Sequence, residues 1–327
     1  AGTQRLAAGS RIMGAKLGRN AIYVWSDTSL FTMRFVGTPF TFAYEQVGTN
    51  CGLLGKNAAV EVDGAAYWMS DNGFFRYTGR LESMDCLVED YVYDDLNTTS
   101  NELVYCGINN LFGEITWFYC TSGSNVVDRS VTYSYLDSTR DRPIWFTNAS
   151  SIFPRTTWED SAVFGLPHAT QYDADTDTCG TVGNTDGISI YYEHETGVNY
   201  IKGGTSYAIP ASITSGDYDI TQKVVRGAAT NMADLRGDGE SIMRVSRIIP
   251  DFVSQTGNAI IQLDLRDYPN DAAASSSLGP FTVTTSTDKV DTRARARAIA
   301  LTISNTAVDS SWKLGTFRLD IQSGGRR

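Results

Sequence analysis

The sequence has little of what a helical or membrane-bound protein needs. It contains no run of 18 apolar residues, and apolar residues at helical spacing are almost absent. We therefore expect no membrane-spanning helix and no stable membrane insertion. The first residues, AGTQRLAAGSRIMG, do not begin with methionine and lack the apolar core of a signal peptide. We interpret the chain as a processed or incomplete part of a longer product.

Cysteine and histidine are also scarce. There are two histidines and five cysteines, and no CxxC pair occurs. An odd number of cysteines without such a pair argues against a disulfide framework and against a zinc site. We expect free, buried thiols, as in a protein assembled in a reducing cytoplasm, and no cofactor. The cysteines are Cys51, Cys86, Cys106, Cys120 and Cys179.

Basic residues are outnumbered by acidic ones, 27 against 37, so the net charge is -10. This balance argues against a protein whose main task is to grip nucleic acid, but not against one along which nucleic acid slides. With 42% hydrophobic and 20% charged residues, the composition is that of a globular protein. A chain of 327 residues suits one large all-β domain or two smaller ones.

What the chain does contain is short β-rich runs between clusters of Gly, Asn, Asp and Ser, which predicts an all-β fold. The clearest case is NAAVEVDGAAYWMSDNGFFRYTG, residues 57–79. Its turn signals, Asp63-Gly64 and Asn72-Gly73, predict two hairpins in quick succession.

The strands of this segment carry apolar side chains at both parities. A two-residue turn at Asp63-Gly64 sets Val60 opposite Tyr67 and Ala59 opposite Trp68. One face then carries Val60, Val62, Tyr67 and Met69, and the other carries Ala59, Ala66 and Trp68 with one charge at Glu61. Because neither face is polar, we expect the sheet to be covered on both sides. The blades of a β-propeller are sheets of that kind.

A repeat supports this interpretation. Residues 20–35 and 65–77 both have an aromatic strand ending in Trp, a Ser-Asp turn, and a strand with Phe and Arg. The Trp spacings are 43 residues (25 to 68) and 49 residues (68 to 117), within the roughly 40 to 50 residues of propeller repeats. The tryptophans concerned are Trp25, Trp68 and Trp117, and a looser fourth unit runs from Trp158 to Tyr200 through SAVFGL and GISIYYEHETG.

The C-terminal third differs from the rest. Between about 203 and 240 the chain is rich in Gly, Ser, Thr and Asp, which suggests a boundary or a long connection. We predict propeller blades over 1–205 and an antiparallel β region over 206–327. That region would form either final blades or a separate β-sandwich. Its expected strands are ESIMRVSRIIPDFV, NAIIQLDLRDYPN, GPFTVTTST, RARARAIALTIS and WKLGTFRLDIQSGG.

One segment has the spacing of a calcium loop. In YDADTDTCGTVGN the carboxylates of Asp173, Asp175 and Asp177 alternate along the chain. However, Thr178 and Asn184 stand where the motif requires Gly and a bidentate Glu. We interpret the segment as a solvated acidic loop.

Other catalytic or metal signatures fail on geometry. In YEHETG, Glu193, His194 and Glu195 would point to alternate faces of a strand and could not bind one metal together. The only other histidine is His168, and no GxSxG elbow accompanies either histidine. We therefore assign no catalytic, metal-binding or cofactor-binding residue and do not expect an enzyme.

Two turn motifs resemble functional signatures only in part. RGDG (236–239) is explained by a Gly-Asp-Gly turn between strands. Ser70 and Asp71 are adjacent, whereas the Asp-box of sialidase propellers separates them by one residue. Turn chemistry accounts for both segments.

The run TRARARAIALTIS is the one candidate contact surface. Strand alternation would place Arg293, Arg295 and Arg297 on one face together with Ile299, Leu301 and Ile303, and four alanines on the other. The arginines could contact the DNA backbone. Alternatively they pair with acidic groups of a neighbouring strand or subunit. The small alanine face, Ala294, Ala296, Ala298 and Ala300, suits close approach of another layer.

Several segments follow one another in an order that resembles a known family. They are YVWSDTSLFTMRFVG, CGLLGKNAAVEVDGAAYWMSDNGFFRYTG, CLVEDYVYDDLN, RIIPDF, RDYPN, GPF and RARARAIALTIS…WKLGTFRLDIQSGGRR. Together they resemble the tail nozzle proteins of short-tailed bacteriophages, also called packaged-DNA stabilisation or tail tubular B-like proteins. The resemblance extends from about residue 20 to the C-terminus. Its most specific parts are residues 57–79, VEDYV and WKLG…RLDI.

The resemblance implies a structural protein of the virion tail, assembled in the host cytoplasm. Six copies, each built around a β-propeller, would ring the tail axis below the head-to-tail adaptor protein. They would form the distal channel, hold packaged double-stranded DNA without sequence specificity, and open for ejection. Residues 121–205 match the family least, so insertions that dock tail fibres or spikes, or form the gate, are expected there.

Two alternative functions remain open at this point. A glycan-binding or glycan-cleaving propeller of a tail fibre or spike would need a carboxylate pair in a pocket with aromatic platforms. VEDYVYDDLN offers four carboxylates for it, although the segment also reads as strand-edge and turn residues: Glu89, Asp90, Asp94 and Asp95. A third option is a protein that grips DNA through Arg293, Arg295 and Arg297.

Overall fold

The chain folds almost entirely into short antiparallel strands, which confirms the predicted all-β class. The computed structural model describes residues 5–149, 154–173, 188–202, 204–220, 241–268 and 274–325. By its internal contacts the chain divides into two units, Ala1–Thr196 and Gly197–Arg327. The boundary predicted after residue 205 thus lies slightly later in the chain than this division.

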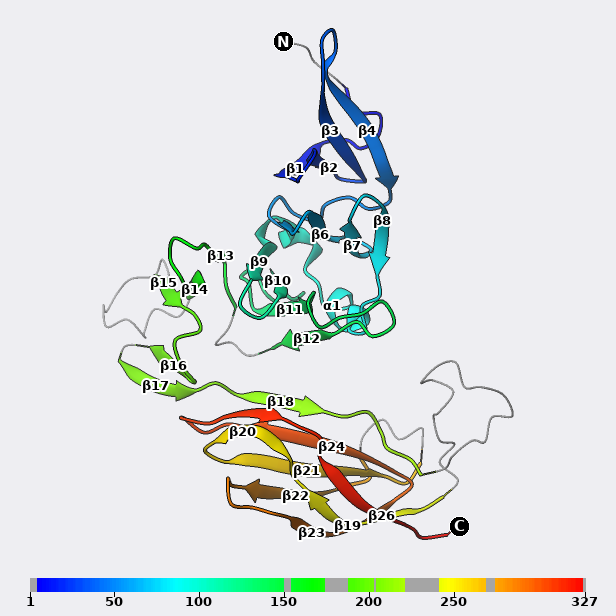
Figure 1. Ribbon diagram of the computed structural model, residues 1–327, viewed down its shortest axis with the longest axis vertical. Coiled ribbons are helices and arrows are strands. Elements are labelled where there is room, and N and C mark those ends of the chain that lie inside the picture. Colours follow the sequence, from blue (N-terminus) through cyan, green and yellow to red (C-terminus); the bar gives the residue numbers. More distant parts are fainter. Residues whose placement is uncertain are drawn as a thin grey trace. The chain divides into compact units, whose positions relative to one another are not determined.

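Three four-stranded sheets follow one another in the first unit, and within each the strands pair in chain order (Figure 1). The first sheet consists of β1 (Ile12–Leu17), β2 (Ile22–Ser26), β3 (Ser29–Gly37) and β4 (Thr41–Thr49). The second consists of β5 (Ala59–Val62), β6 (Ala65–Ser70), β7 (Gly73–Tyr77) and β8 (Leu81–Met84). The third consists of β9 (Tyr105–Asn109), β10 (Glu114–Tyr119), β11 (Arg129–Ser134) and β12 (Trp145–Asn148).

The first predicted hairpin is confirmed in turn and register. Asp63 and Gly64 form the two-residue loop with φ angles of 53° and 88°, the left-handed conformation that such loops require. The pairs Val60–Tyr67 and Ala59–Trp68 lie opposite each other as expected.

The second turn lies one residue earlier than predicted. Ser70 pairs with Gly73, so Asp71 and Asn72 form the loop and Gly73 begins β7. Gly73 has a φ of 134°, which side chains on Cβ disfavour. The glycine is therefore needed at the first strand position, not within the loop.

Both faces of the second sheet are covered, as its sequence predicted. Every residue of β6 is buried, and most residues of β5 and β7 are buried as well, including the adjacent pairs Ala59–Val60 and Gly73–Phe74. The structure therefore explains why this segment has no polar face.

The repeated tryptophans occupy equivalent places in the three sheets. Trp25 lies on β2, Trp68 on β6 and Trp117 on β10, each the second strand of its sheet by chain order. All three side chains are completely buried. The Ser-Asp pair after Trp25 and Trp68 leads into the turn before the third strand in both sheets, as predicted.

Aromatic pairs join each sheet to the next. The ring centroids of Trp25 and Trp68 are 5.4 Å apart, and those of Phe74 and Trp117 are 5.0 Å apart. Such pairs add about 0.5 to 1.5 kcal/mol each beyond the area that they bury. One apolar core consequently runs through all three sheets.

Indole N–H groups add hydrogen bonds across these junctions. Trp68 donates to the carbonyl of Cys51 (2.9 Å), and Trp117 donates to that of Ala58 (3.0 Å), just ahead of β5. Trp25 differs, because its buried Nε1 has no hydrogen-bond partner.

The fourth unit departs from the repeat. Its described part is a three-stranded sheet of β13 (Thr157–Glu159), β14 (His168–Asp173) and β15 (Ile188–Glu193). Trp158 lies on the first of these strands, and SAVFGL forms the connection between β13 and β14 instead of a strand. Trp158 still stacks on Phe118 at 6.1 Å and donates to the carbonyl of Ile108 (2.6 Å).

Within VEDYVYDDLN, Glu89–Tyr93 form a short helix, α1, so the interpretation of the segment as strand edge is wrong, while Asp94 and Asp95 lie in a turn as expected. Val92 is completely buried and the hydroxyl of Tyr93 donates to the carbonyl of Ser70 (2.8 Å). A strand would turn these adjacent residues to opposite faces, whereas a helical turn lets both face the core. The 3₁₀ helix η1 (Thr98–Leu103) follows.

The second unit is built from two larger sheets and two hairpins (Figure 1). One sheet has the order β18 (Ala211–Thr214), β24 (Ala298–Asn305), β21 (Ala259–Arg266) and β22 (Ser276–Val283). The other has the order β23 (Val290–Ala296), β19 (Met243–Ile249) and β26 (Arg318–Ser323). The hairpins are β16 (Asn199–Lys202) with β17 (Thr205–Ala208), and β20 (Phe252–Thr256) with β25 (Ser311–Leu314).

Both larger sheets contribute to one apolar core. Met243 and Ile248 come from one sheet, and Ile261, Leu263 and Leu301 come from the other. Two sheets around a shared core form a β-sandwich. Of the two arrangements predicted for the C-terminal region, the structure thus shows the sandwich.

In the described part of the chain, four cysteines are free, namely Cys51, Cys106 and Cys120, which are buried, and Cys86, which is half-buried. This confirms the expected free thiols at these positions, while Cys179 lies outside the described residues. No helix among the described residues is long and apolar enough to cross a bilayer.

The indole hydrogen bond of Trp117 predicts a difference between two similar substitutions. Trp117→Phe removes one of the two hydrogen bonds that the carbonyl of Ala58 accepts, because the backbone N–H of Met69 still donates to it (3.1 Å). The substitution should therefore lower the free energy of unfolding by about 0.5 to 1.5 kcal/mol more than Trp25→Phe does. The latter removes an N–H that has no partner. Urea unfolding followed by tryptophan fluorescence reports mainly on the first unit, and equal losses for the two variants would contradict the prediction.

Candidate nucleic-acid or subunit interface

The arginine-rich run forms two strands in different sheets. β23 ends at Ala296 and pairs with β19, whereas β24 begins at Ala298 and pairs with β21 and β18. Arg297 lies between them, where the chain crosses from one sheet to the other. The prediction of one continuous strand is therefore wrong.

The crossing reverses the alternation of buried and exposed residues. Before it, Arg293 and Arg295 are exposed and Ala294 and Ala296 are buried. After it, Ile299, Leu301 and Ile303 are buried. The arginines thus do not share a face with these aliphatic residues, because each set reaches its preferred environment in its own sheet. The predicted close packing of the alanine face is confirmed at Ala294 and Ala296, which are 0% and 2% exposed.

Arg295 lies directly opposite Arg244 of β19, and both side chains are exposed. Like charges in this position destabilise a sheet. Within the described residues, no ion pair involves Arg244, Arg293 or Arg295. This part of the sheet therefore carries an uncompensated positive charge in an acidic chain.

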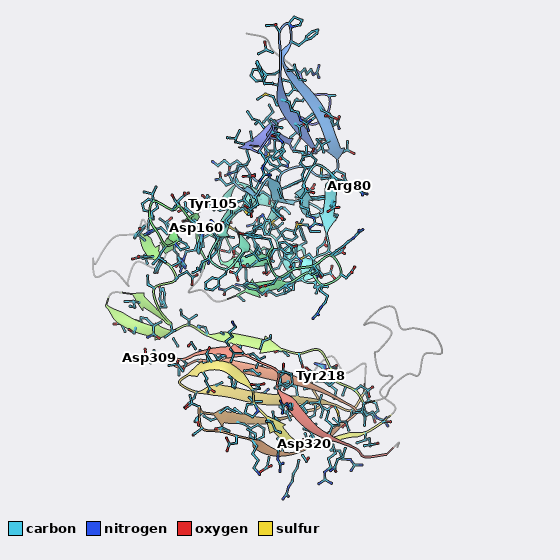
Figure 2. The ribbon with its side chains drawn as sticks, viewed as in Figure 1. Arg80, Tyr105, Asp160, Tyr218, Asp309 and Asp320 are labelled. Carbon is cyan, nitrogen blue, oxygen red and sulfur yellow. The ribbon has the colours of Figure 1, made fainter. Side chains whose placement is uncertain are left out.

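The acids of the same sheet are engaged by another arginine. Arg247 contacts Asp291 at 2.9 Å and Asp320 of β26 at 3.5 Å, and Figure 2 marks Asp320. The hydrogen bond from Arg247 lowers the pKa of Asp291, and the same bond raises the pKa of Arg247. Because Arg247 binds Asp291 and Asp320, these acids do not neutralise Arg293 and Arg295, which can therefore bind a partner.

Arg295 and Arg297 also line an open depression of about 350 Å³. Its other walls are Ile242, Asp267, Tyr268 and Ala296. A guanidinium group presents a planar fork of donors that matches phosphate or carboxylate oxygens. The depression therefore suits an anionic group, either from a DNA backbone or from an acidic segment of another subunit.

Sequence reasoning considered His194 but missed its partner Arg155, which is buried, whereas His194 is half-buried. Nε of Arg155 donates to Nε2 of His194 (3.0 Å), and its Nη1 donates to Gln171 (2.9 Å). The guanidinium lies 4.3 Å from the ring centroid of Tyr192. Burial, and then the charge of Arg155, lower the pKa of His194 to about 3. The imidazole is therefore neutral at physiological pH and acts as a hydrogen-bond acceptor.

Only Glu193 of the Glu-His-Glu motif lies on a strand, because β15 ends there, so the expected alternation along a strand does not apply to His194 and Glu195. The ring of His194 packs on Trp158, with centroids 4.5 Å apart, while Glu193 lies opposite His168 on β14. In the part of the chain that the structure describes, no group of three His, Cys, Asp or Glu residues could hold a metal ion. Asp175, Asp177 and the RGDG segment lie outside that part.

Two carboxyl groups in the first unit have raised pKa values. Glu114 lies opposite Asn109, whose amide donates to the carboxylate of Glu195 (2.9 Å). Burial raises the pKa of Glu114, with a smaller contribution from Glu195. Partial desolvation raises the pKa of Glu195 too, although the residue itself is exposed. A glycan-cleaving enzyme uses a carboxylic acid with a raised pKa near a second carboxylate. Glu114 and Glu195 are therefore the residues at which that alternative function would place its general acid.

The acids of VEDYVYDDLN do not form such a pair. Asp95 accepts a hydrogen bond from the hydroxyl of Ser122 (2.5 Å), beyond the end of α1. Glu89 and Asp90 lie in the first turn of α1, and Asp94 caps its C-terminal end. Their positions are explained by the ends of the helix.

Charge reversal at Arg295 should stabilise the sheet. Arg295→Glu would replace repulsion by Arg244 with attraction, raising the free energy of unfolding of the second unit by about 0.2 to 1 kcal/mol at low salt. Chemical unfolding with and without 1 M NaCl measures this, because salt screens the pair. In an Arg244→Gln background the gain should vanish, and a gain that persists there would show that the pair is not its source.

His194 should make the protein sensitive to acid. The unfolded chain binds a proton at this residue below its ordinary pKa of 6.5, whereas the native state does not until about pH 3. Native stability is therefore lost as pH falls through that window, by roughly 3 to 5 kcal/mol in total. His194→Gln keeps an acceptor for Arg155 and should flatten this loss. His168→Gln controls for removing a histidine, and equal pH profiles for wild type and His194→Gln would refute the assignment.

Comparisons with known proteins give no identity. No family model matches the chain, and no curated protein matches it. Among solved structures it is similar to one described as a glycoside hydrolase, with 10% sequence identity and a TM-score of 0.26. The alignment covers 93% of this chain and 82% of that one. A similarity at this level supports neither a fold nor a function.

Proposed function

We propose that the chain is a subunit of the distal tail nozzle of a short-tailed bacteriophage, a ring-shaped conduit that retains packaged DNA and opens for ejection. Its first unit would be part of a β-propeller, and six copies would surround the tail axis. The proposed partners are the head-to-tail adaptor protein, tail fibres or spikes, and the double-stranded DNA inside the channel.

The observation that carries this proposal is the succession of four-stranded sheets joined through buried aromatic residues. Trp25, Trp68 and Trp117 occupy equivalent strands, and each sheet packs on the next. Face-to-face sheets with strands in chain order are the building plan of propeller blades. The segments that resemble the nozzle family coincide with these sheets, with α1 and with strands of the second unit.

The charge of the chain suits a conduit. DNA that must leave quickly should meet few cations, because each phosphate contact adds affinity and drag. A chain with a net charge of -10 can present a weakly repelling lumen. The exposed Arg293 and Arg295 would then serve as local contacts, either with a neighbouring subunit or with the DNA backbone.

Electron cryo-microscopy of the purified protein and of virions tests the proposal directly. We expect a six-fold ring, located on the tail axis in the virion. A protein that stays monomeric at all concentrations, or that lies away from the axis, would overturn it. Hydrolysis of host glycans by the purified chain, lost in Glu114→Gln, would favour the glycan-cleaving alternative.

A charge-reversal variant tests what binds the surface that carries Arg293 and Arg295, which we call the arginine face. Arg293→Glu with Arg295→Glu should reduce the salt dependence of DNA binding by about two phosphate contacts if the face meets DNA. If the face meets a subunit, the same variant should dissociate the ring. Lys313→Glu, on β25, is the matched control for the change of charge, and a variant that alters neither property would exclude both roles for these arginines.

A further inference from the structure

The first sheet has an apolar face on the side opposite Trp25, which we call the outer face of the first sheet. A cross-strand row of Leu17, Ile22, Met33 and Tyr44 spans all four strands, each residue opposite the next. Phe35 and Phe42 form the adjoining pair, with ring centroids 5.9 Å apart. The outer face therefore comprises Leu17, Ile22, Met33, Tyr44, Phe35 and Phe42.

The part of this face next to the β3–β4 hairpin is poorly covered, whereas Val24 and Phe31, on the same side of the sheet, are only 8% and 3% exposed. Leu17 is 76% exposed, Phe35 73% and Phe42 47%. By contrast, all residues of β6 in the second sheet are buried. An apolar face of this size left in water marks an interaction surface.

The hairpin of β3 and β4 extends the face beyond the rest of its sheet, as Figure 1 shows at the top of the view. No charged residue occurs between Arg34 and Glu45, and Phe40 at the tip is 80% exposed. At about 150 to 250 Å² for each whole aromatic side chain, the exposed aromatic residues of the hairpin leave roughly 350 to 600 Å² in water. A standard interface needs about 800 Å² from each partner, so these rings alone supply about half.

The opposite end of the stack, the β13–β15 sheet, also has an uncovered aromatic face. His168 stacks on Tyr191, with which it shares a hydrogen bond, and contacts Phe164 edge-on at 4.8 Å. Tyr191 is 63% exposed and Phe164 57%. The other side of this sheet packs on the third sheet through Trp158. We call Phe164, His168 and Tyr191 the outer face of the last sheet.

We infer that the outer face of the first sheet binds the outer face of the last sheet of a second copy of this chain. In this contact, aromatic residues of two copies pack one sheet against another, as they do between the sheets within one copy. Because the two faces differ, the contact is head-to-tail, and such contacts close into rings when the rotation between copies permits. The inference deepens the proposed ring function and rests on it.

Phe35→Ser with Phe42→Ser tests the inference on the full-length protein. Both residues are exposed, so the variant should fold, which circular dichroism checks. Mass photometry should show monomers where the wild type forms rings, with a dissociation constant raised at least about 100-fold, since each buried phenylalanine contributes about 1.5 kcal/mol or more. Tyr191→Ser should weaken the ring in the same way. Leu87→Ser is the matched control, because Leu87 is 77% exposed and lies outside both faces.

Cysteine cross-linking shows which faces meet. Phe42→Cys mixed with Tyr191→Cys should give disulfide-linked dimers, while neither variant alone should do so. Dimers from Phe42→Cys alone would mean that the outer face of the first sheet binds itself, and would overturn the head-to-tail contact. A different outcome would be binding of the wild type to phosphatidylcholine vesicles. If Phe35→Ser with Phe42→Ser abolished that binding and left the ring unchanged, the hairpin would be a lipid-binding surface and the inference would be overturned.

The outcomes also separate this inference from the proposed function. A ring that persists in all serine variants overturns the inference and leaves the proposed function standing. A wild-type chain that forms no ring at any concentration overturns both.

Discussion

The structure of the first unit depends on covering sheets that have no polar face. A strand such as β6, buried at every position, has no stable place at a water-exposed surface, so the second sheet requires a neighbour on each side. Tryptophan fulfils this need, because one large side chain fills the space between sheets and its N–H can bond to the backbone of the adjoining segment, as in Trp68 and Trp117. The regular spacing of these residues follows from that requirement, since each four-stranded sheet needs one such contact.

In the second unit, charge determines where the chain changes sheets. The run from Arg293 to Ile303 contains residues that require water followed by residues that require the core, at the same parity. No single strand can satisfy both, and the crossing at Arg297 resolves the conflict. The same crossing brings two arginines to the outer surface above buried alanines, so the sandwich core and the positive face arise from one feature of the sequence.

Local chemistry made part of this structure predictable. The Asp63-Gly64 turn, its register and the tryptophan repeat depend on neighbouring residues or on a fixed period, and both can be read from one sequence. The arginine crossing was missed because strand alternation does not signal a change of sheet. The pair of Arg155 and His194 was missed because its members are 39 residues apart and meet only after folding. The exposed outer face of the first sheet could not be inferred either, since apolar strands read alike whether or not something covers them.

The two units differ in how far apart their paired strands lie along the chain, which affects when each can form. In the first three sheets every strand pairs with its neighbour in sequence, so a sheet can assemble as soon as its own residues leave the ribosome. The sandwich instead pairs β18 with β24 and β19 with β26, strands that lie far apart in sequence. Its core therefore stays open until β26 has been synthesised. Completion of β26 is thus the step that converts a partly folded chain into a subunit with both cores closed.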